Sequence, residues 1–216
     1  MMLVNELRYR RLLLTIQPRR YVNLFRSIYQ RRCRSLVEIG TWNGMHAEQM
    51  IRVAAVRWGV GVVSYTGFDL FEDLTEEQFR QEYSKRPPSY QEVLARLEQT
   101  GARITLHRGN TRQTLPRASE ALRRADLVFI DGGHSIETIT ADWDAVQRAM
   151  SPGTTVLFDD YYPDPSPELD GLGCQTIVDG LDQARFSVEV LQPTDEFPQP
   201  WGTLRVQIAR VTLNQR

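Results

Sequence analysis

The sequence lacks a long hydrophobic run: among its 216 residues no apolar stretch approaches the roughly 20 that span a bilayer. It also lacks the features of a secretory signal. Arg8, Arg10 and Arg11 interrupt the apolar residues near the N-terminus, and no small-residue cleavage site follows them. We therefore expect a cytoplasmic protein with no membrane span.

Cysteine and histidine are also scarce. The two cysteines, Cys33 and Cys174, are far apart and do not have the spacing of metal ligands, which predicts unpaired thiols in a reducing compartment. The three histidines, His46, His107 and His134, are scattered along the chain. The sequence therefore favours neither a disulfide framework nor a zinc site.

Positive and negative charges nearly balance, with a formal net charge of −1, but they are unevenly distributed. Residues 1–34 hold nine of the 26 basic residues and one of the 27 acidic ones. A helical segment whose arginines are solvated, or pack on the acidic remainder, explains this better than nucleic-acid or anionic-lipid contact. We expect helices at 3–16 and 21–32, separated by Pro18, and regard them as a candidate homo-oligomer interface.

From residue 35 onward, short apolar runs alternate with helical patterns. We expect one α/β domain over residues 35–216, with a Rossmann-like, doubly wound, seven-stranded sheet that is mostly parallel and ends in an antiparallel hairpin. Strands are predicted at 35–39, 62–68, 103–107, 127–130, 154–158, 186–191 and 203–211, with a loop at 192–202 inside the hairpin. Two polar excursions, at 70–88 and 163–173, are candidate lids or simple surface decoration.

The strand, helix, strand unit from Leu127 to Tyr162 directs polar residues to one sheet edge. Its strands lead into Asp131 and into Asp159 and Asp160, and parallel strands bring these acids together at the edge where open α/β sheets bind ligands. Converging carboxylates raise one another's pKa unless a cation lies among them, and an all-oxygen set suits Mg²⁺. Acids that cap a helix or accept loop N–H groups are the alternative interpretation.

The turn after the first predicted strand carries the pattern Glu38-x-Gly40-x-x-x-Gly44. Glycines here let the backbone approach a ligand closely, and the following helix offers free N–H groups. A dinucleotide-binding fingerprint requires glycine where this chain has Trp42, which argues against a nicotinamide oxidoreductase. Asp69, at the end of the second predicted strand, has two acceptor oxygens for the hydroxyls of a ribose. The pattern thus favours a nucleoside ligand.

This turn, together with Asp69, resembles the class I S-adenosylmethionine-dependent methyltransferases over about residues 35–211. The resemblance implies that the glycine turn wraps the methionine part of the cofactor, that Asp69 holds the ribose and that Asn110 lies beside the adenine. Asn110 stands where the family commonly has an acidic residue. The cofactor-binding residues implied are Glu38, Gly40, Thr41, Asn43, Gly44, Asp69, Asn110 and Asp131.

Within that family, the segment from Asp131 to His134, followed by Asp159 and Asp160, is similar to metal-dependent O-methyltransferases of bacterial natural-product and sugar tailoring. This resemblance implies that the three aspartates bind Mg²⁺, that His134 is the general base and that the methyl acceptor is a small-molecule hydroxyl. Two alternatives stay open. One is a metal-independent methyltransferase, and the other is a non-catalytic nucleoside-binding partner protein of the same fold.

Overall fold

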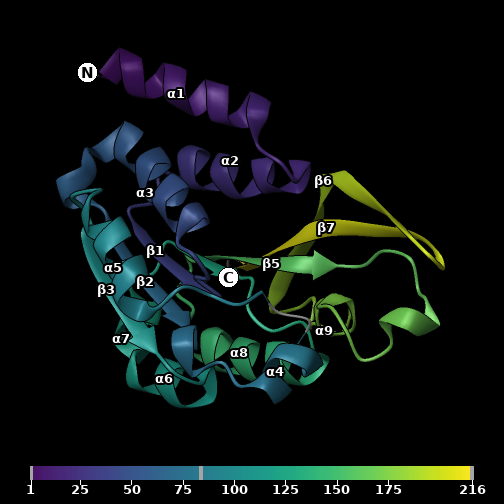
Figure 1. The fold of residues 1–216 in the computed structure, drawn as a ribbon. Helices are drawn as coiled ribbons and strands as arrows, with labels where there is room; N and C mark the ends of the chain where they lie inside the picture. The colour runs from purple at the N-terminus through teal and green to yellow at the C-terminus, as the bar shows by residue number, and fades with distance from the viewer. Residues whose placement is uncertain (1, 83–84, 215–216) are drawn as a thin grey trace.

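The computed structural model describes residues 2–82 and 85–214. Its centre is a seven-stranded sheet in the order β3-β2-β1-β4-β5-β7-β6 (Figure 1). Strands β1 to β5 run parallel, and β7 runs antiparallel between β5 and β6. This arrangement confirms the predicted fold class. The strands are β1 Ser35–Ile39, β2 Ser64–Asp69, β3 Arg103–Arg108, β4 Leu127–Ile130, β5 Thr155–Tyr161, β6 Phe186–Gln199 and β7 Gly202–Leu213.

Helices cover both faces of the sheet, as alternating strands and helices predict. On one side lie α2, α3 and α5, with α1 outside them, and on the other side lie α6, α7, α8 and α9 (Figure 1). The helices are α1 Met2–Thr15, α2 Val22–Gln30, α3 Met45–Trp58, α4 Glu76–Gln81, α5 Tyr90–Glu98, α6 Thr111–Arg117, α7 Ser119–Arg123, α8 Ile136–Ala149 and α9 Gln175–Asp179. Within residues 2–82 and 85–214, no helix has both the length and the apolar character needed to cross a membrane.

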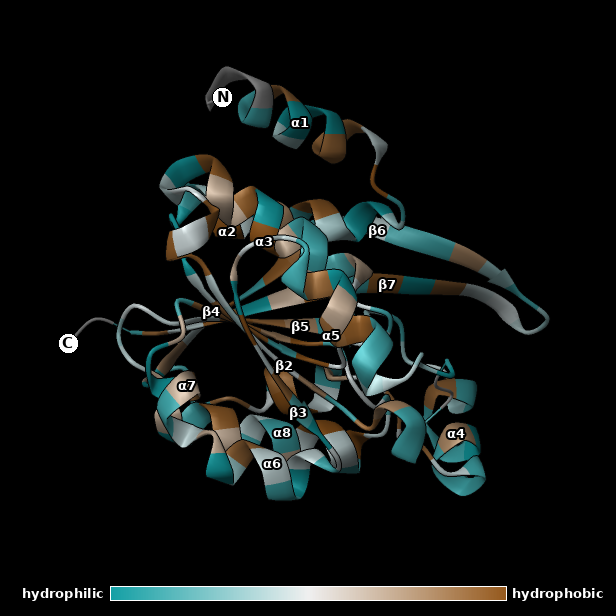
Figure 2. Cartoon of the chain, turned by 60° about the vertical axis from the view of Figure 1, so that its left-hand side comes forward, coloured by the Kyte–Doolittle hydropathy of each residue, from teal (hydrophilic) through white to brown (hydrophobic). Residues whose placement is uncertain are grey.

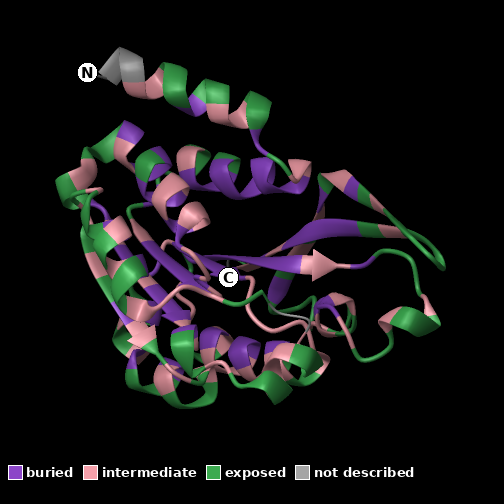
Figure 3. Ribbon diagram, viewed as in Figure 1, coloured by how far each residue is buried: buried purple, intermediate pink, exposed green. Residues whose placement is uncertain are grey.

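The hydrophobic core has two halves, one on each side of the sheet. Successive strand residues point to opposite faces, so Leu36 packs in the half under α2 and α3 while Val37 and Ile39 pack in the half that faces α8. Apolar residues concentrate on the strands and on the helix faces toward them (Figure 2), and the buried residues follow the same distribution (Figure 3). The strand ends are thereby held rigidly, which allows their terminal side chains to form a site.

Local signals predicted most helix starts. The spacing of Thr75 with Gln78 and of Ser89 with Glu92 predicts two capping boxes, and both are confirmed, each with its Thr or Ser side chain accepting the N–H group three residues later. The sequence also predicts a helix at about 115–124, but this prediction is wrong at its start, and two helices, α6 and α7, occupy the region. Helix α6 begins four residues earlier because the Asn110 side chain accepts the N–H of Arg112 and caps it.

The loop predicted at 192–202 is also wrong, because β6 continues through most of it. Pro193 and Pro198 can lie in β6 because it is the edge strand of the sheet, where a residue without an N–H group is tolerated. The register with β7 shifts between Leu191 and Asp195, so β6 is bulged there. The long hairpin that results projects beyond the helices (Figure 1) and carries Asp195 toward the N-terminal segment.

Candidate active site

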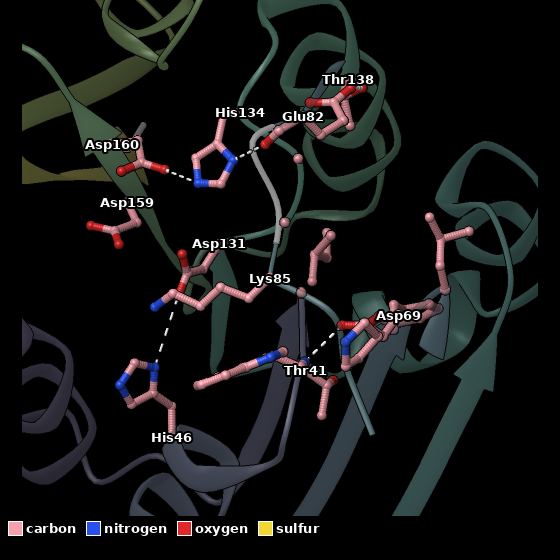
Figure 4. A pocket seen from close by; sticks show the side chains of 18 of the residues that line it. Thr41, His46, Asp69, Glu82, Lys85, Asp131, His134, Thr138, Asp159 and Asp160 are labelled. Carbon is pink, nitrogen blue, oxygen red and sulfur yellow. Dashed lines mark hydrogen bonds and ion pairs between the residues drawn. The ribbon is translucent and has the colours of Figure 1, made fainter. Parts of the chain in front are cut away.

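A cavity of about 620 Å³ opens at the carboxyl ends of the parallel strands (Figure 4), the edge predicted for ligand binding. Parts of the N-terminal segment and of the polar segment at 70–88 also line it, whereas no residue of 163–173 does. Most of the predicted site residues meet there: Gly40, Thr41, Asn43, Asp69, Asn110, Asp131, His134, Asp159 and Asp160. Glu38 and Gly44 are absent from the lining of this cavity.

The turn after β1 packs directly against the end of β4. Gly40 has φ +95°, and a Cβ placed on it would lie 1.9 Å from the backbone oxygen of Asp131, so glycine is required. Beneath the turn, the fully buried Glu38 carboxylate accepts a hydrogen bond from the Tyr65 hydroxyl, which lies 3.1 Å from Thr41 Oγ1. Burial raises the pKa of Glu38 to about 8. Glu38 therefore supports the turn from below and does not face the cavity.

Asp69 connects the turn after β1 with the segment after β2. Its carboxylate accepts the backbone N–H of Trp42 at 2.7 Å and that of Phe71 at 2.8 Å. Both of those residues have positive φ, 46° and 49°, so Asp69 stabilises a backbone conformation that side chains disfavour. Each carboxylate oxygen keeps a second lone pair for another donor. Burial raises the pKa of Asp69.

A bulge in β5 lets two successive aspartates reach the cavity. In a regular strand neighbouring side chains point to opposite faces, but the register with β7 shifts between Phe158 and Tyr161, and Asp160 has φ +55°. Asp159 and Asp160 consequently both face Asp131, and one oxygen from each of the three carboxylates lies within 4.8 Å of the others. The predicted meeting of these acids at one edge is confirmed.

Asp159 has a cationic partner that sequence analysis did not identify. Arg20, in a short 3₁₀ helix that ends at Tyr21, binds it with two parallel hydrogen bonds, Nε to Oδ1 at 2.6 Å and Nη2 to Oδ2 at 2.8 Å. The Tyr21 hydroxyl donates to the same Oδ2 at 2.8 Å. Burial alone would raise the pKa of Asp159, but the guanidinium charge and the hydrogen bonds from Arg20 and Tyr21 together outweigh it, and the pKa is lowered.

The other two aspartates have weaker partners. Within the described part of the chain, neither Asp131 nor Asp160 forms an ion pair with an arginine or lysine. Asp131 Oδ2 lies 3.9 Å from Nδ1 of His46, and burial with the neighbouring acids raises the pKa of Asp131 well above its usual range. The same causes raise the pKa of Asp160 to about 6. Converging oxygen donors with uncompensated negative charge fit a hard divalent cation.

His134 lies between Asp160 and the segment after β2 (Figure 4). Its Nε2 is 3.2 Å from Asp160 Oδ2, and its Nδ1 contacts the backbone oxygen of Glu82. A carbonyl oxygen only accepts hydrogen bonds, so Nδ1 carries the hydrogen and Nε2 is the nitrogen that can take up a proton. The Glu82 carboxylate accepts hydrogen bonds from Ser135 and Thr138, which ties this segment to the start of α8.

Comparison with known proteins agrees with this geometry. A family model described as a methyltransferase domain matches residues 37–161, from β1 to the end of β5. The chain belongs to this methyltransferase family. The match includes both the glycine turn and the three aspartates, and it confirms the resemblance to class I methyltransferases and the expectation of an enzyme. No curated protein matches the chain.

Solved structures share the fold of this methyltransferase at low sequence identity. Cofactor-bound Rv0187 from MTB is 15% identical with a TM-score of 0.64, and the alignment covers 100% of this chain and 90% of that one. The O-methyltransferase TomG from Streptomyces achromogenes, in complex with SAM, is 16% identical with a TM-score of 0.59 and coverages of 98% and 89%. An O-methyltransferase from Bacillus cereus in complex with SAH is 14% identical with a TM-score of 0.59 and coverages of 98% and 90%.

Several residues that line the cavity of this methyltransferase were missed as site residues. Arg20 and Tyr21 lie in the N-terminal helical segment, which the sequence suggested as a candidate homo-oligomer interface, and no local motif marks them. His46 had a usable signal, because it follows the glycine turn in the first turn of α3 and so faces the same edge. Lys85 lies with its Nζ 4.9 Å from the centre of the Trp42 ring, which brings the segment after β2 against the turn.

Proposed function

We propose that this methyltransferase transfers a methyl group from S-adenosylmethionine to a hydroxyl oxygen of a small molecule, assisted by Mg²⁺. One observation carries the proposal: a single cavity joins the turn at Gly40 and the carboxylate of Asp69 to the three-aspartate cluster and His134. The structural neighbours from Streptomyces achromogenes and Bacillus cereus, named as O-methyltransferases in complex with SAM and SAH, support the donor and the reaction class.

The nucleoside end of the cavity is formed by the ends of β1, β2 and β3. S-adenosylmethionine supplies an electrophilic methyl group when it is bound. We assign the backbone around Gly40 to the methionine part, the remaining lone pairs of Asp69 to the ribose hydroxyls, and Asn110 to the vicinity of the adenine. Orienting two reactants within one site can supply roughly 7 to 11 kcal/mol of the barrier reduction, so this rigid positioning is the main catalytic contribution expected of the fold.

His134 is the proposed general base. Its Nδ1 is engaged by the Glu82 carbonyl, which orients the ring and presents Nε2 to the cavity beside Asp160. Nε2 would take the proton of the acceptor hydroxyl as that oxygen bonds to the methyl carbon and the bond from this carbon to the sulfonium sulfur breaks, which leaves S-adenosylhomocysteine. General-base catalysis of this kind typically contributes about 10²- to 10⁴-fold in rate.

The aspartate cluster is the proposed Mg²⁺ site. Asp131 and Asp160 would hold the ion with Asp159 as a third ligand, and the bound ion would orient the acceptor oxygen and lower the pKa of its hydroxyl. The pKa values of Asp131 and Asp160 are raised first by burial and then by the neighbouring carboxylates, and a bound cation would offset both effects, which supports this assignment. The involvement of TomG in tomaymycin synthesis supports a natural-product acceptor.

A second candidate is the same transfer without a metal, with His134 acting alone. The ion pair between Arg20 and Asp159 favours it, because the cluster already contains one cation. Calorimetric titration with SAH, with and without Mg²⁺, followed by assays on a panel of hydroxyl acceptors, separates the candidates. Absence of SAH binding would refute the donor. Turnover that survives both EDTA and the Asp160→Asn substitution would refute the role of the metal.

A further inference from the structure

Arg20 is held in the cavity wall by both its backbone and its side chain. Asp195, on the bulged part of β6, accepts the backbone N–H of Arg19 at 2.7 Å and that of Arg20 at 2.9 Å, and it also accepts from Nη1 of Arg20 at 3.3 Å. The guanidinium lies 4.7 Å from the centre of the Tyr21 ring and 6.0 Å from that of Phe197. These contacts leave little freedom to withdraw the positive charge from the cluster.

The pairing of Arg20 with Asp159 makes the three carboxylates unequal. Both oxygens of Asp159 accept from the guanidinium, and one of them also accepts from Tyr21. The carboxylates of Asp131 and Asp160 contact histidine or tyrosine and keep free acceptor capacity. A divalent cation that enters the cluster therefore meets two available carboxylates, a third that is already engaged, and a fixed positive charge beside it.

We propose that Arg20 is a built-in counter-ion that keeps the aspartate cluster assembled in the absence of metal and weakens its binding of divalent cations. The inference rests on the metal part of the proposed function. Like charges repel at short range in a site of low effective dielectric, and the guanidinium also competes for the oxygens of Asp159. Arg20 is thus a positioning residue that acts through Asp159. Because it weakens cation binding, a bound divalent cation would exchange readily with the solvent.

The test measures cation affinity directly. Free Mn²⁺ is followed by electron paramagnetic resonance during titration of the full chain, so the readout does not depend on turnover. Arg20→Met removes the charge and keeps an unbranched side chain as far as the position of Nε, and we expect it to bind Mn²⁺ at least about tenfold more tightly than the unmodified chain. Arg20→Lys keeps the charge and should stay within about threefold of it. Arg205→Met, which removes an exposed arginine of the same hairpin, is the matched control and should change nothing.

Equal Mn²⁺ affinity in Arg20→Met and the unmodified chain would overturn the proposal, as would a gain of the same size in Arg20→Lys. If Arg20→Met does not fold, Arg20→Gln, whose neutral side-chain amide can donate a hydrogen bond to Asp159, is measured instead with the same expected gain. Absence of Mn²⁺ binding in every variant would overturn both this inference and the proposed metal site. Calorimetric SAH binding by the same samples tests the methyltransferase assignment separately.

Discussion

The carboxyl group of Asp142 should make the stability of the fold depend on pH. It is buried on α8 in the lining of the cavity, and one of its oxygens has no hydrogen-bond partner among the described residues. Burial raises its pKa from 3.8 to about 7. The folded chain therefore keeps a proton over a range in which the unfolded chain has released it. The stability that this group contributes is complete below about pH 4 and is lost as pH rises to about 7.

Asp142→Asn replaces this carboxyl group with a neutral amide of the same shape. Each pKa unit corresponds to about 1.4 kcal/mol, so the stability of the variant relative to the unmodified chain should rise by roughly 1 to 3 kcal/mol between pH 5 and pH 8. Urea unfolding at both pH values, without cofactor, measures this difference. Asp144→Asn is the control, because Asp144 lies on the same helix and accepts a hydrogen bond from Gln147. An advantage of the Asp142 variant that is equal at both pH values would refute the argument.

Three further substitutions test the site. His134→Ala should lower kcat about 10²- to 10⁴-fold while SAH affinity in calorimetry is retained, and undiminished turnover would exclude the base. Asp69→Ala should weaken SAH binding at least about tenfold because it removes a charged acceptor and releases the backbone of Trp42 and Phe71, so unchanged affinity would remove the ribose assignment. Gly40→Ala should abolish SAH binding, since the added Cβ would overlap the backbone of Asp131. A folded variant with normal SAH affinity would contradict the close packing of the turn after β1 against the end of β4.

The sheet and its edge were predictable because their signals are local. A short apolar run that ends in aspartate, followed by an amphipathic helix and a second such run, specifies two parallel strands, and parallel strands bring their ends together. Asp131 and Asp160 could therefore be assigned to one site before any contact was known. The exact route of β5 was not predictable, because the bulge that turns Asp160 into the cavity depends on pairing with β7, which comes about 40 residues later.

The cationic partner of Asp159 was not predictable from local sequence. A carboxylate at the end of a strand is positioned by the strand itself, but the charge that balances it can come from any segment that packs nearby. Arg20 and Asp159 are 139 residues apart in sequence, and Arg20 and Asp195 are 175 apart. Contacts between residues so far apart produce no recognisable spacing in the sequence. The arginine-rich composition of residues 1–34 predicted a positive face without distinguishing which arginine is buried.

The extended hairpin and the N-terminal segment are consequently parts of one arrangement. The bulge in β6 presents Asp195 to two successive backbone N–H groups, and this holds the 3₁₀ helix that carries Arg20 and Tyr21 over the end of β5. A shorter hairpin, whose first strand ended near Leu191 as predicted, would leave those N–H groups without this acceptor and the guanidinium without its second carboxylate. The length of β6 and the charge balance at Asp159 therefore have a common physical basis, although the two features lie at opposite ends of the sequence.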